Sequence, residues 1–334
     1  MSEKYKKYLL IATALTFAVI LATVVATLIF GNREGERQQS DSATESFKGA
    51  DKPYCILVTG EDKVSGLCDV IMLVSVDTRN ERICVMQIPR DTYAEYTDRS
   101  YKKLNGAANA LGADGLRGFL EQSLGVIIDG YLTLDLAAFR NIIDTLGGVE
   151  IELEKAIRYT DAEQGLFIDL PSGKQVLDGE RAEMLVRYRK GYADGDIGRL
   201  GAQKRFLAAL FATLKQKVNS DNAYRLAESL IDGVGTDIDI ATVVALGLKA
   251  LSLDSDGLLF VTAPGEQAVA EKSGASYYVL SAIATDKLLC EYFGKSETQE
   301  FDKDRSFRHP SYQSFIAIYE STPEPYLVSA DELE

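Results

Sequence analysis

The sequence predicts an α/β fold in which a mixed central β-sheet is flanked by helices. Short apolar runs of strand length alternate along the chain with longer segments whose apolar residues recur at helical spacing. Turn residues at 77–80 separate two of the apolar runs so closely that we expect an antiparallel hairpin, which makes the sheet mixed. This pattern extends over 53–294, roughly 240 residues, which is enough for one large core.

The first part of this core begins with three predicted strands. Residues 54–59 form a short apolar run that ends at Gly60, and 70–76 form another, as expected of buried strands. The turn at 77–80 leads into a third strand over 83–88.

Helices and strands alternate in the rest of the core. Residues 115–124 and 136–146 have helical spacing, and Gly147-Gly148 suits the C-cap of the second helix. Asp178 is expected to cap a short helix that leads to Val186. The remaining predicted elements are strands at 131–134, 149–153 and 258–262 and helices at 206–217, 223–230 and 240–251.

The N-terminal segment predicts a membrane anchor. Residues 8–30 carry no charge, and at about 1.5 Å per residue a helix over them reaches roughly 34 Å, enough to cross a bilayer core. Three lysines in 1–7 favour a cytoplasmic N-terminus, which leaves the later residues outside the cytoplasm at the cell membrane. A cleaved signal peptide is the alternative, although its apolar region is usually shorter and no clear cleavage site follows.

Polar segments border the predicted core on both sides. Residues 31–52 have almost no apolar content and are expected to form a flexible stalk, and 295–334 are expected to form a polar tail. The single histidine, His309, lies in that tail, which argues against histidine-based catalysis. The net charge of −14 argues against nucleic acid as a partner, because an acidic chain has no basic face for counterion release.

The four cysteines are too few and too scattered for a disulfide framework or a zinc motif. Cys55 and Cys84 fall inside predicted strands, where a buried free thiol is the plainer interpretation. An extracytoplasmic disulfide stays open, and the sequence selects no pair among Cys55, Cys68, Cys84 and Cys290.

Three arginines lie close together in this acidic chain, which indicates an anion site. Arg187 and Arg189 are two positions apart in a segment that we expect to be extended, so both side chains leave the same face. Arg199 and Gln203 share one face of a helix expected to start near Gly198. Because guanidinium groups form paired hydrogen bonds with phosphate oxygens, the pattern predicts a phosphate-holding site.

An apolar stripe continues along the same helix. Phe206, Leu207 and Leu210 follow the polar end at helical spacing, so a phosphate site would lead into an apolar stretch. Plainer explanations stay open: the first two arginines could pair with Asp194 and Asp196, and the stripe could be ordinary core.

Two aspartates stand where the first two predicted strands end and begin. Asp62 comes just past the first strand and Asp69 immediately precedes the second, so their carboxylates converge at one sheet end if the strands are neighbours. Two carboxylates with room for water and phosphate suit Mg²⁺, although loop aspartates are more often turn or cap residues. Arg90-Asp91, after the third strand, and Lys103 and Asn105, from a loop, could reach the same edge.

In this order and over 53–294, the motifs of the chain resemble those of the LytR-CpsA-Psr family, which attaches glycopolymers to bacterial cell walls. The matching segments are LVTGED at 57–62, DVIMLV at 69–74, IPRDT at 88–92, KLNGA at 103–107, LGGV at 146–149, LDGERA at 177–182, VRYR at 186–189, and DIGR at 196–199 with Gln203.

The resemblance implies an apolar tunnel for a polyprenyl chain with a pyrophosphate site at its mouth. It implies that Asp62 and Asp69 bind Mg²⁺ and that Phe206, Leu207 and Leu210 contact the lipid. Catalysis would rest on Arg90, Asp91 and Lys103, and the general base stays open among Asp62, Asp69 and Asp91. The pyrophosphate would be held by Arg90, Lys103, Arg187, Arg189, Arg199 and Gln203.

The activity implied is a phosphotransferase reaction that moves a glycopolymer from an undecaprenyl-pyrophosphate-linked precursor to peptidoglycan and releases polyprenyl phosphate. The polymer would be a teichoic acid or a capsular or secondary wall polysaccharide. One departure stands out, because the family's usual Arg-Ser-Asp is here Leu67-Cys68-Asp69. This departure leaves open a catalytically weakened protein that binds lipid pyrophosphate in a regulatory role. A polyprenyl-pyrophosphate hydrolase is a further alternative, because the same site could use water in place of the sugar hydroxyl.

Overall fold

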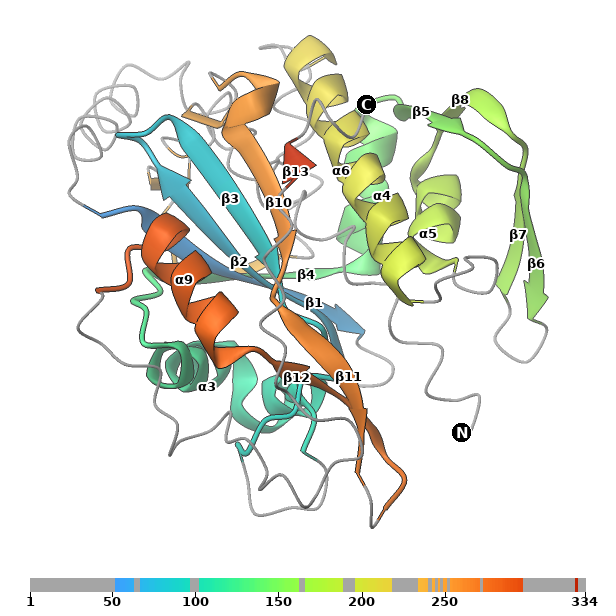
Figure 1. The fold of residues 1–334 in the computed structure, drawn as a ribbon. Helices are drawn as coiled ribbons and strands as arrows, with labels where there is room; N and C mark the ends of the chain where they lie inside the picture. Colours follow the sequence, from blue (N-terminus) through green and yellow to red (C-terminus); the bar gives the residue numbers. More distant parts are fainter. Residues whose placement is uncertain are drawn as a thin grey trace.

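A seven-stranded mixed sheet forms the centre of the protein (Figure 1). The computed structural model describes residues 52–62, 67–96, 102–161, 166–188, 196–217, 234–239, 242–243, 246, 249–250, 253–270, 273–296 and 328–329. In spatial order the strands are β13 (Val328–Ser329), β10 (Leu258–Thr262), β3 (Arg82–Gln87), β2 (Leu67–Asp77), β1 (Tyr54–Asp62), β4 (Gly130–Asp135) and β9 (Val234–Thr236).

Strand directions confirm that the sheet is mixed. The hairpin expected around 77–80 is present, since β2 pairs antiparallel with β3, and β1 pairs antiparallel with β2. Strand β4 pairs parallel with β1, and β10 pairs parallel with β3. The carboxyl ends of β1, β3, β4 and β10 therefore lie at one edge of the sheet, together with the amino end of β2.

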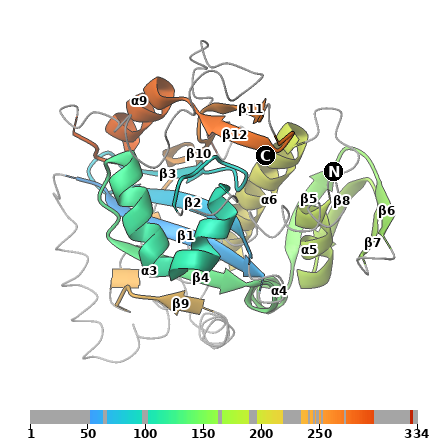
Figure 2. The same cartoon turned by 90° about the horizontal axis from the view of Figure 1, so that it is seen from below.

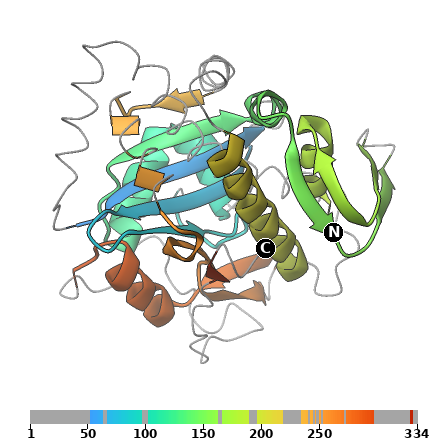
Figure 3. The same cartoon turned by 90° about the horizontal axis from the view of Figure 1, so that it is seen from above.

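Helices cover both faces of the sheet, as Figures 2 and 3 show from opposite sides. One face carries α3 (Leu104–Leu124) and α9 (Ala282–Tyr292). The other carries α4 (Leu136–Thr145), α5 (Gly179–Arg187) and α6 (Asp196–Lys217).

Alternate side chains along the strands contribute to two hydrophobic cores, one on each face of the sheet. Ile56 and Val58 of β1 belong to the core beneath α4, α5 and α6, whereas Cys55 and Leu57 belong to the core beneath α3 and α9. All four side chains are buried, because a strand covered on both faces turns alternate residues to opposite helical layers.

Three two-stranded ladders lie outside the main sheet. A short 3₁₀ turn, η3 (Ser255–Gly257), leads into β10. Two of the ladders form an arm beside α5 (Figure 1), and the third follows β10. Their strands are β5 (Val149–Leu153) with β8 (Gly173–Leu177), β6 (Ile157–Asp161) with β7 (Leu166–Leu170), and β11 (Gly265–Val269) with β12 (Ser276–Leu280).

Most predicted elements are confirmed, and β1, β2 and α3 are longer than expected. Helix α3 begins at Leu104 rather than at 115, because a helical segment that was not predicted precedes the expected one, and Gly112, with a non-helical φ of 70° and ψ of 177°, forms the kink between the two. Helix α6 begins at Asp196 and includes the segment predicted at 206–217. The sequence did not predict β6, β7, β8, β9, β11, β12, β13 or α9. The expectation that 295–334 forms only a polar tail is wrong at 328–329, because β13 pairs with β10 and extends the main sheet.

Several expectations concern residues outside the described ranges. These include the anchor at 8–30, the helix at 223–230 and nearly all of the stalk and tail. Of the helix predicted at 240–251, only 242–243, 246 and 249–250 are described, and these residues are helical. Within the described part of the chain, no helix combines the length and apolar character needed to span a membrane.

The C-terminal end of α9 is capped by side chains from three neighbouring strands. Carbonyl oxygens at the end of a helix have no intrahelical partner. Here Arg82 of β3 donates to Glu291 O at 2.6 Å, Ser75 of β2 donates to Tyr292 O, and the Cys55 thiol of β1 approaches Phe293 O at 3.6 Å. Side chains of β1, β2 and β3 therefore contact the carbonyl groups at the C-terminal end of α9.

Helices α4 and α5 cross at very close range at Gly179. Asp178 caps α5 by accepting from Arg181 N at 2.8 Å, as its position predicted, and Gly179 N donates to Asp144 Oδ1 at 2.7 Å. A Cβ on Gly179 would lie 2.5 Å from the carbonyl oxygen of Arg140, so only glycine fits without a shift of the backbone.

We expect Gly179→Ala to lower the free energy of unfolding by about 1–3 kcal/mol, the usual cost of overpacking. The matched control is Gly118→Ala, where the added Cβ meets nothing within 4 Å on an exposed face of α3. It should raise stability by roughly 0.5–1 kcal/mol, because alanine favours the helix. Urea unfolding followed by near-ultraviolet circular dichroism measures both, and equal effects of the two variants would contradict the contact.

All four cysteines are free in the structure, and Cys55, Cys68 and Cys84 are buried while Cys290 is partly exposed. Burial, reinforced by Asp129, raises the pKa of Cys55 to about 12, and burial also raises the pKa of Cys84. Since the thiolate is the reactive form, we expect only Cys290 to react with a disulfide reagent at pH 8 in the native protein. Titration before and after unfolding counts the thiols, and two fast native thiols would refute the assignment.

Candidate functional site

The two predicted metal-binding aspartates belong to neighbouring strands at the same sheet edge. Asp62 is the last residue of β1 and pairs with Leu67, the first residue of β2. The ladder shifts register here: Gly60 pairs with Val70 and Glu61 with Cys68, which makes Asp69 the extra residue of a β-bulge. Bulges are common beside active sites because they re-aim side chains.

This backbone arrangement fits the donor set that Mg²⁺ requires. The strands are neighbours, which was the condition for Asp62 and Asp69 to converge, and carboxylate oxygens are suitable ligands. Among the described side chains, no three His, Cys, Asp or Glu residues form a metal-binding cluster. The side chains of Asp62 and Asp69 lie outside that set.

Arg90 follows β3 in a turn that is held by the start of α3. The first backbone N–H groups of a helix lack intrahelical partners, and those of Leu104 and Asn105 donate to the carbonyls of Thr92 and Arg90 at 2.9 and 3.0 Å. No side chain caps this helix, so the turn takes the place of the cap. Within the turn, both the N–H and the hydroxyl of buried Thr92 donate to the carbonyl of Pro89.

The turn brings Arg90, Asp91 and Lys103 together, although they come from two segments. The Lys103 ammonium lies 2.9 Å from the Asp91 carboxylate, with side chains that are 17% and 33% exposed. Arg90 is only 5% exposed, which is rare because burying a charge is costly unless other groups stabilise it. The three residues predicted to be catalytic, buried Arg90 and the Lys103–Asp91 ion pair, are thus all at this turn, and we call them the charged group; the turn lies at the sheet edge that also holds Asp62 and Asp69.

The expected extended conformation at Arg187 is wrong. Helix α5 continues through Arg187, and the chain becomes extended only at Tyr188, with φ −73° and ψ 137°. The predicted helix was expected to lead to Val186, and α5 continues for one more residue, so the argument that placed Arg187 and Arg189 on one face of an extended segment does not apply. Arg189 and Asp194 lie outside the described residues.

Arg199 and Gln203 lie in the first two turns of α6, in agreement with the predicted helix, and their side chains are not described. Figure 1 shows the N-terminal end of α6 on the same side of the molecule as the carboxyl end of β1. The Phe206, Leu207 and Leu210 side chains are buried in the core beneath α6. Their contact with a lipid stays a prediction.

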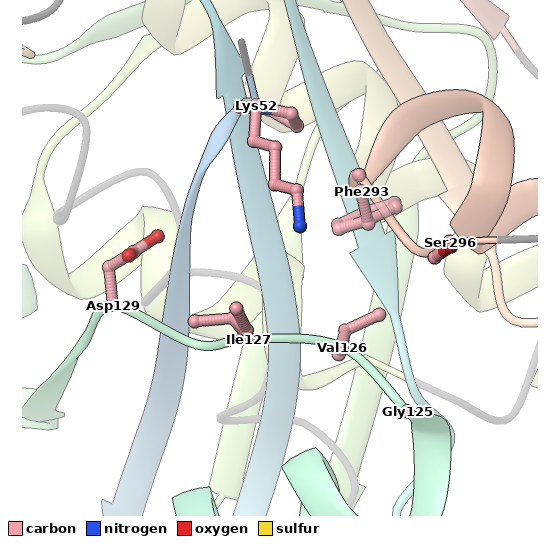
Figure 4. A pocket seen from close by; sticks show the side chains of 9 residues that line it. Lys52, Gly125, Val126, Ile127, Asp129, Phe293 and Ser296 are labelled. Carbon is pink, nitrogen blue, oxygen red and sulfur yellow. The ribbon is translucent and has the colours of Figure 1, made fainter. Parts of the chain in front are cut away.

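A hollow of about 260 Å³ opens at the opposite edge of the sheet, near the start of β1 (Figure 4). The Lys52 side chain extends into it, and Asp129 lies on its border, where the carboxylate accepts from Cys55 N at 2.7 Å. Burial raises the pKa of Asp129 above its usual range, against the lowering effect of that hydrogen bond. None of the predicted site residues lines this hollow.

The β11–β12 hairpin, which was not predicted from the sequence, contacts the Arg90 turn. Tyr278 N donates to Asp91 O at 2.9 Å, and Tyr93 N donates to Tyr278 O at 2.8 Å. The Lys103 ammonium lies 5.6 Å from the ring centre of Tyr277. The run of aromatic and aliphatic residues in SYYVL at 276–280 was the signal that could have identified β12.

Comparison with known proteins gives consistent matches. TagV of Bacillus subtilis, named a polyisoprenyl-teichoic acid–peptidoglycan teichoic acid transferase, is 31% identical over 204 residues, 58% of this chain and 52% of TagV. The chain thus spans about half the length of that relative. TagU of Halalkalibacterium halodurans, named likewise, is 27% identical over 70% of this chain and 81% of its own. The regulatory protein MsrR of Staphylococcus aureus is 29% identical over 69% of this chain and 71% of its own.

Comparison with solved structures finds a protein of the same group. The crystal structure of Bacillus subtilis TagV superposes with a TM-score of 0.62 at 26% identity, over 73% of this chain and 98% of that structure. A sequence model of the LytR-CpsA-Psr (LytR_cpsA_psr) family matches residues 23–292, which include every described segment of the sheet except β13. With its motifs, its mixed sheet and this match over most of its length, the chain belongs to the LytR-CpsA-Psr family.

Proposed function

We propose that this protein transfers a glycopolymer from an undecaprenyl-pyrophosphate-linked precursor to peptidoglycan and releases polyprenyl phosphate. The observation that supports it most is the charged group of Arg90, Asp91 and Lys103 at the edge that also holds Asp62 and Asp69. The names of TagV and TagU, teichoic acid transferases, favour a teichoic acid over a capsular polysaccharide as the polymer.

In the proposed reaction, a peptidoglycan sugar hydroxyl attacks the sugar-proximal phosphorus. A new O–P bond forms, the bond from this phosphorus to the bridging oxygen breaks, and polyprenyl phosphate leaves with the bonding electrons. The hydroxyl proton passes to one of the carboxylates at the edge, Asp62, Asp69 or Asp91. Because the transferring group carries its charge on equatorial oxygens, positioning and electrostatics supply most of the catalysis.

Cationic side chains bind the pyrophosphate in this proposal. Buried Arg90 offers a guanidinium whose surroundings exclude water, where charge-assisted hydrogen bonds are strong. Asp62 and Asp69 would hold Mg²⁺, which when bound neutralises charge on the phosphate oxygens. The other groups that bind the pyrophosphate are Lys103, Arg187, Arg189, Arg199 and Gln203.

The lipid part of the substrate calls for an apolar surface and a location at the membrane. We place the polyprenyl chain against the stripe of Phe206, Leu207 and Leu210 beneath α6. Because these side chains are buried, α6 must move away from the sheet to admit the lipid. The anchor at 8–30 would hold the protein at the cell membrane, with 1–7 in the cytoplasm and 53–294 outside, where the precursor and peptidoglycan meet.

The test is release of polyprenyl phosphate from a lipid-pyrophosphate oligosaccharide by the full-length protein in detergent, with and without peptidoglycan oligomers. We expect release that needs Mg²⁺ and is stimulated by the acceptor. Arg90→Ala and Asp69→Ala should each slow it by about 100-fold or more, the usual effect of removing one preorganised contact to the transition state.

Arg158→Ala is the matched control, because this arginine forms an exposed ion pair with Asp169 on the β6–β7 ladder. It should leave the rate unchanged. Release that is indifferent to the acceptor would instead support the hydrolase, and unimpaired release by Arg90→Ala would overturn the proposed site.

A second candidate function, a lipid-pyrophosphate binding protein with weakened catalysis, is favoured by one residue. Leu67 stands where the family usually has arginine, and it pairs with Asp62 at the end of the β1–β2 ladder. Loss of a charge-assisted hydrogen bond costs about 1.5–3 kcal/mol, or roughly one to two powers of ten in rate. Tight lipid binding without turnover would identify this function.

Leu67→Arg tests the consequence of this departure. Position 67 pairs with Asp62, so the new arginine would begin at the edge where the pyrophosphate is proposed to bind. We expect it to raise the rate of polyprenyl phosphate release by about 10-fold or more. Leu67→Met, which keeps the side chain apolar, is the control and should have no effect. If Leu67→Arg is as slow as the unmodified protein, the missing guanidinium does not limit the reaction.

A further inference from the structure

The β11–β12 hairpin reaches the charged group because of the order of the strands. Strand β10 lies next to β3 and parallel to it, so the hairpin that follows β10 emerges beside the turn that follows β3. Ala263 N donates to Gln87 O at 2.8 Å, which keeps the two strands together up to their ends. The hydroxyl of Tyr278 then donates to Ala263 O at 2.8 Å and ties the hairpin back to this point.

Backbone hydrogen bonds join the hairpin to the turn on both sides of Thr92. Tyr278 N donates to Asp91 O, and Tyr278 O accepts from Tyr93 N. These two bonds make Thr92 and Tyr278 an isolated parallel β-bridge between the turn and β12. Tyr93 also bridges to Lys103 on its other side. The hairpin, the turn and the start of α3 therefore form one continuous hydrogen-bonded unit.

The ring of Tyr277 is fixed within this unit. Tyr277 is 9% exposed and packs with Ala268 and Val279 in a small core of the hairpin. Its ring meets that of Tyr93 edge to face, with 5.3 Å between the centres, and the Tyr93 hydroxyl donates to the Glu95 carboxylate at 2.7 Å. A ring held on several sides offers a rigid surface to a neighbouring cation.

The Lys103 ammonium lies between this ring and a carboxylate. It is 5.6 Å from the Tyr277 ring centre and 2.9 Å from Asp91 Oδ1. A lysine ammonium at the end of four flexible methylene groups loses much side-chain entropy when it is held in one place. Attraction to the ring face offsets part of that loss and leaves donors of the ammonium free to turn toward a substrate.

We propose that Tyr277 is a positioning residue, which acts through Lys103 by holding its ammonium beside Asp91 at the pyrophosphate site. This inference rests on the proposed transfer reaction and adds to it a specific role for the β11–β12 hairpin. Tyr277 itself touches no reacting atom. Its contribution is to keep Lys103 in the geometry that the transition state needs.

The experiment compares Tyr277→Leu with Tyr277→Phe in the full-length protein, using the release assay. Tyr277→Phe keeps the ring face and should retain the rate within about 2-fold. Tyr277→Leu removes it and should lower kcat by about 3- to 10-fold, the range that a partly buried cation–π contact supplies, with KM nearly unchanged.

A matched control exists at the opposite edge of the sheet. Arg82 lies 4.5 Å from the ring centre of Tyr292, an aromatic–cation pair of the same kind with no contact to the site. Tyr292→Leu should leave kcat unchanged, which separates loss of an aromatic contact in general from loss of the one at Lys103. Thermal unfolding of each variant verifies that the protein is folded.

A double-mutant cycle with Lys103→Met separates positioning from general support of the structure. If Tyr277 acts through Lys103, Tyr277→Leu will slow the unmodified protein but cause no further loss in the Lys103→Met background. Additive losses, or equal losses in Tyr277→Phe and Tyr277→Leu, would overturn the inference. An unmodified protein with no transfer activity would instead refute the proposed function on which it rests.

Discussion

The backbone hydrogen bonds between the start of α3 and the turn after β3 are the constraint on which the site depends. A helix begins with N–H groups that need acceptors, and here the carbonyls of Arg90 and Thr92 supply them. Helix stability and site geometry are therefore coupled: the bonds that cap α3 also set Lys103 beside Asp91. The β11–β12 hairpin adds a second set of backbone bonds, so both the start of α3 and the hairpin hold the turn.

This rigidity suits the proposed site, which would bind charged phosphate groups. Cations at such a site repel one another before the substrate arrives, and a flexible loop would let them separate. Here Arg90 is held in place by burial and Lys103 by its ion pair with Asp91. Both positive charges therefore stay at this edge of a protein whose net charge is −14. Electrostatic stabilisation that is built in advance costs no reorganisation during the reaction.

Much of the fold and part of the site were predictable, because both leave local signals. The strands β1, β2, β3 and β10 are apolar runs of strand length, and Asp178 has the position of an N-cap. Arg187 shows the limit of local reasoning. The sequence led us to expect an extended segment with Arg187 and Arg189 on one face, whereas α5 continues through Arg187. Tyr277 carries no charge and no motif, so nothing marked it.

The sequence by itself determined the class of fold, the motifs of the family and the residue types that bear the chemistry, because periodicity and short motifs are properties of neighbouring residues. Only the tertiary structure decided that β10 pairs with β3 and that the hairpin after β10 meets the Arg90 turn. The physical reason is that strand pairing joins segments far apart in the chain. Hydrogen-bond ladders are nearly alike for any two strands, so the choice of neighbour depends on how the whole core packs.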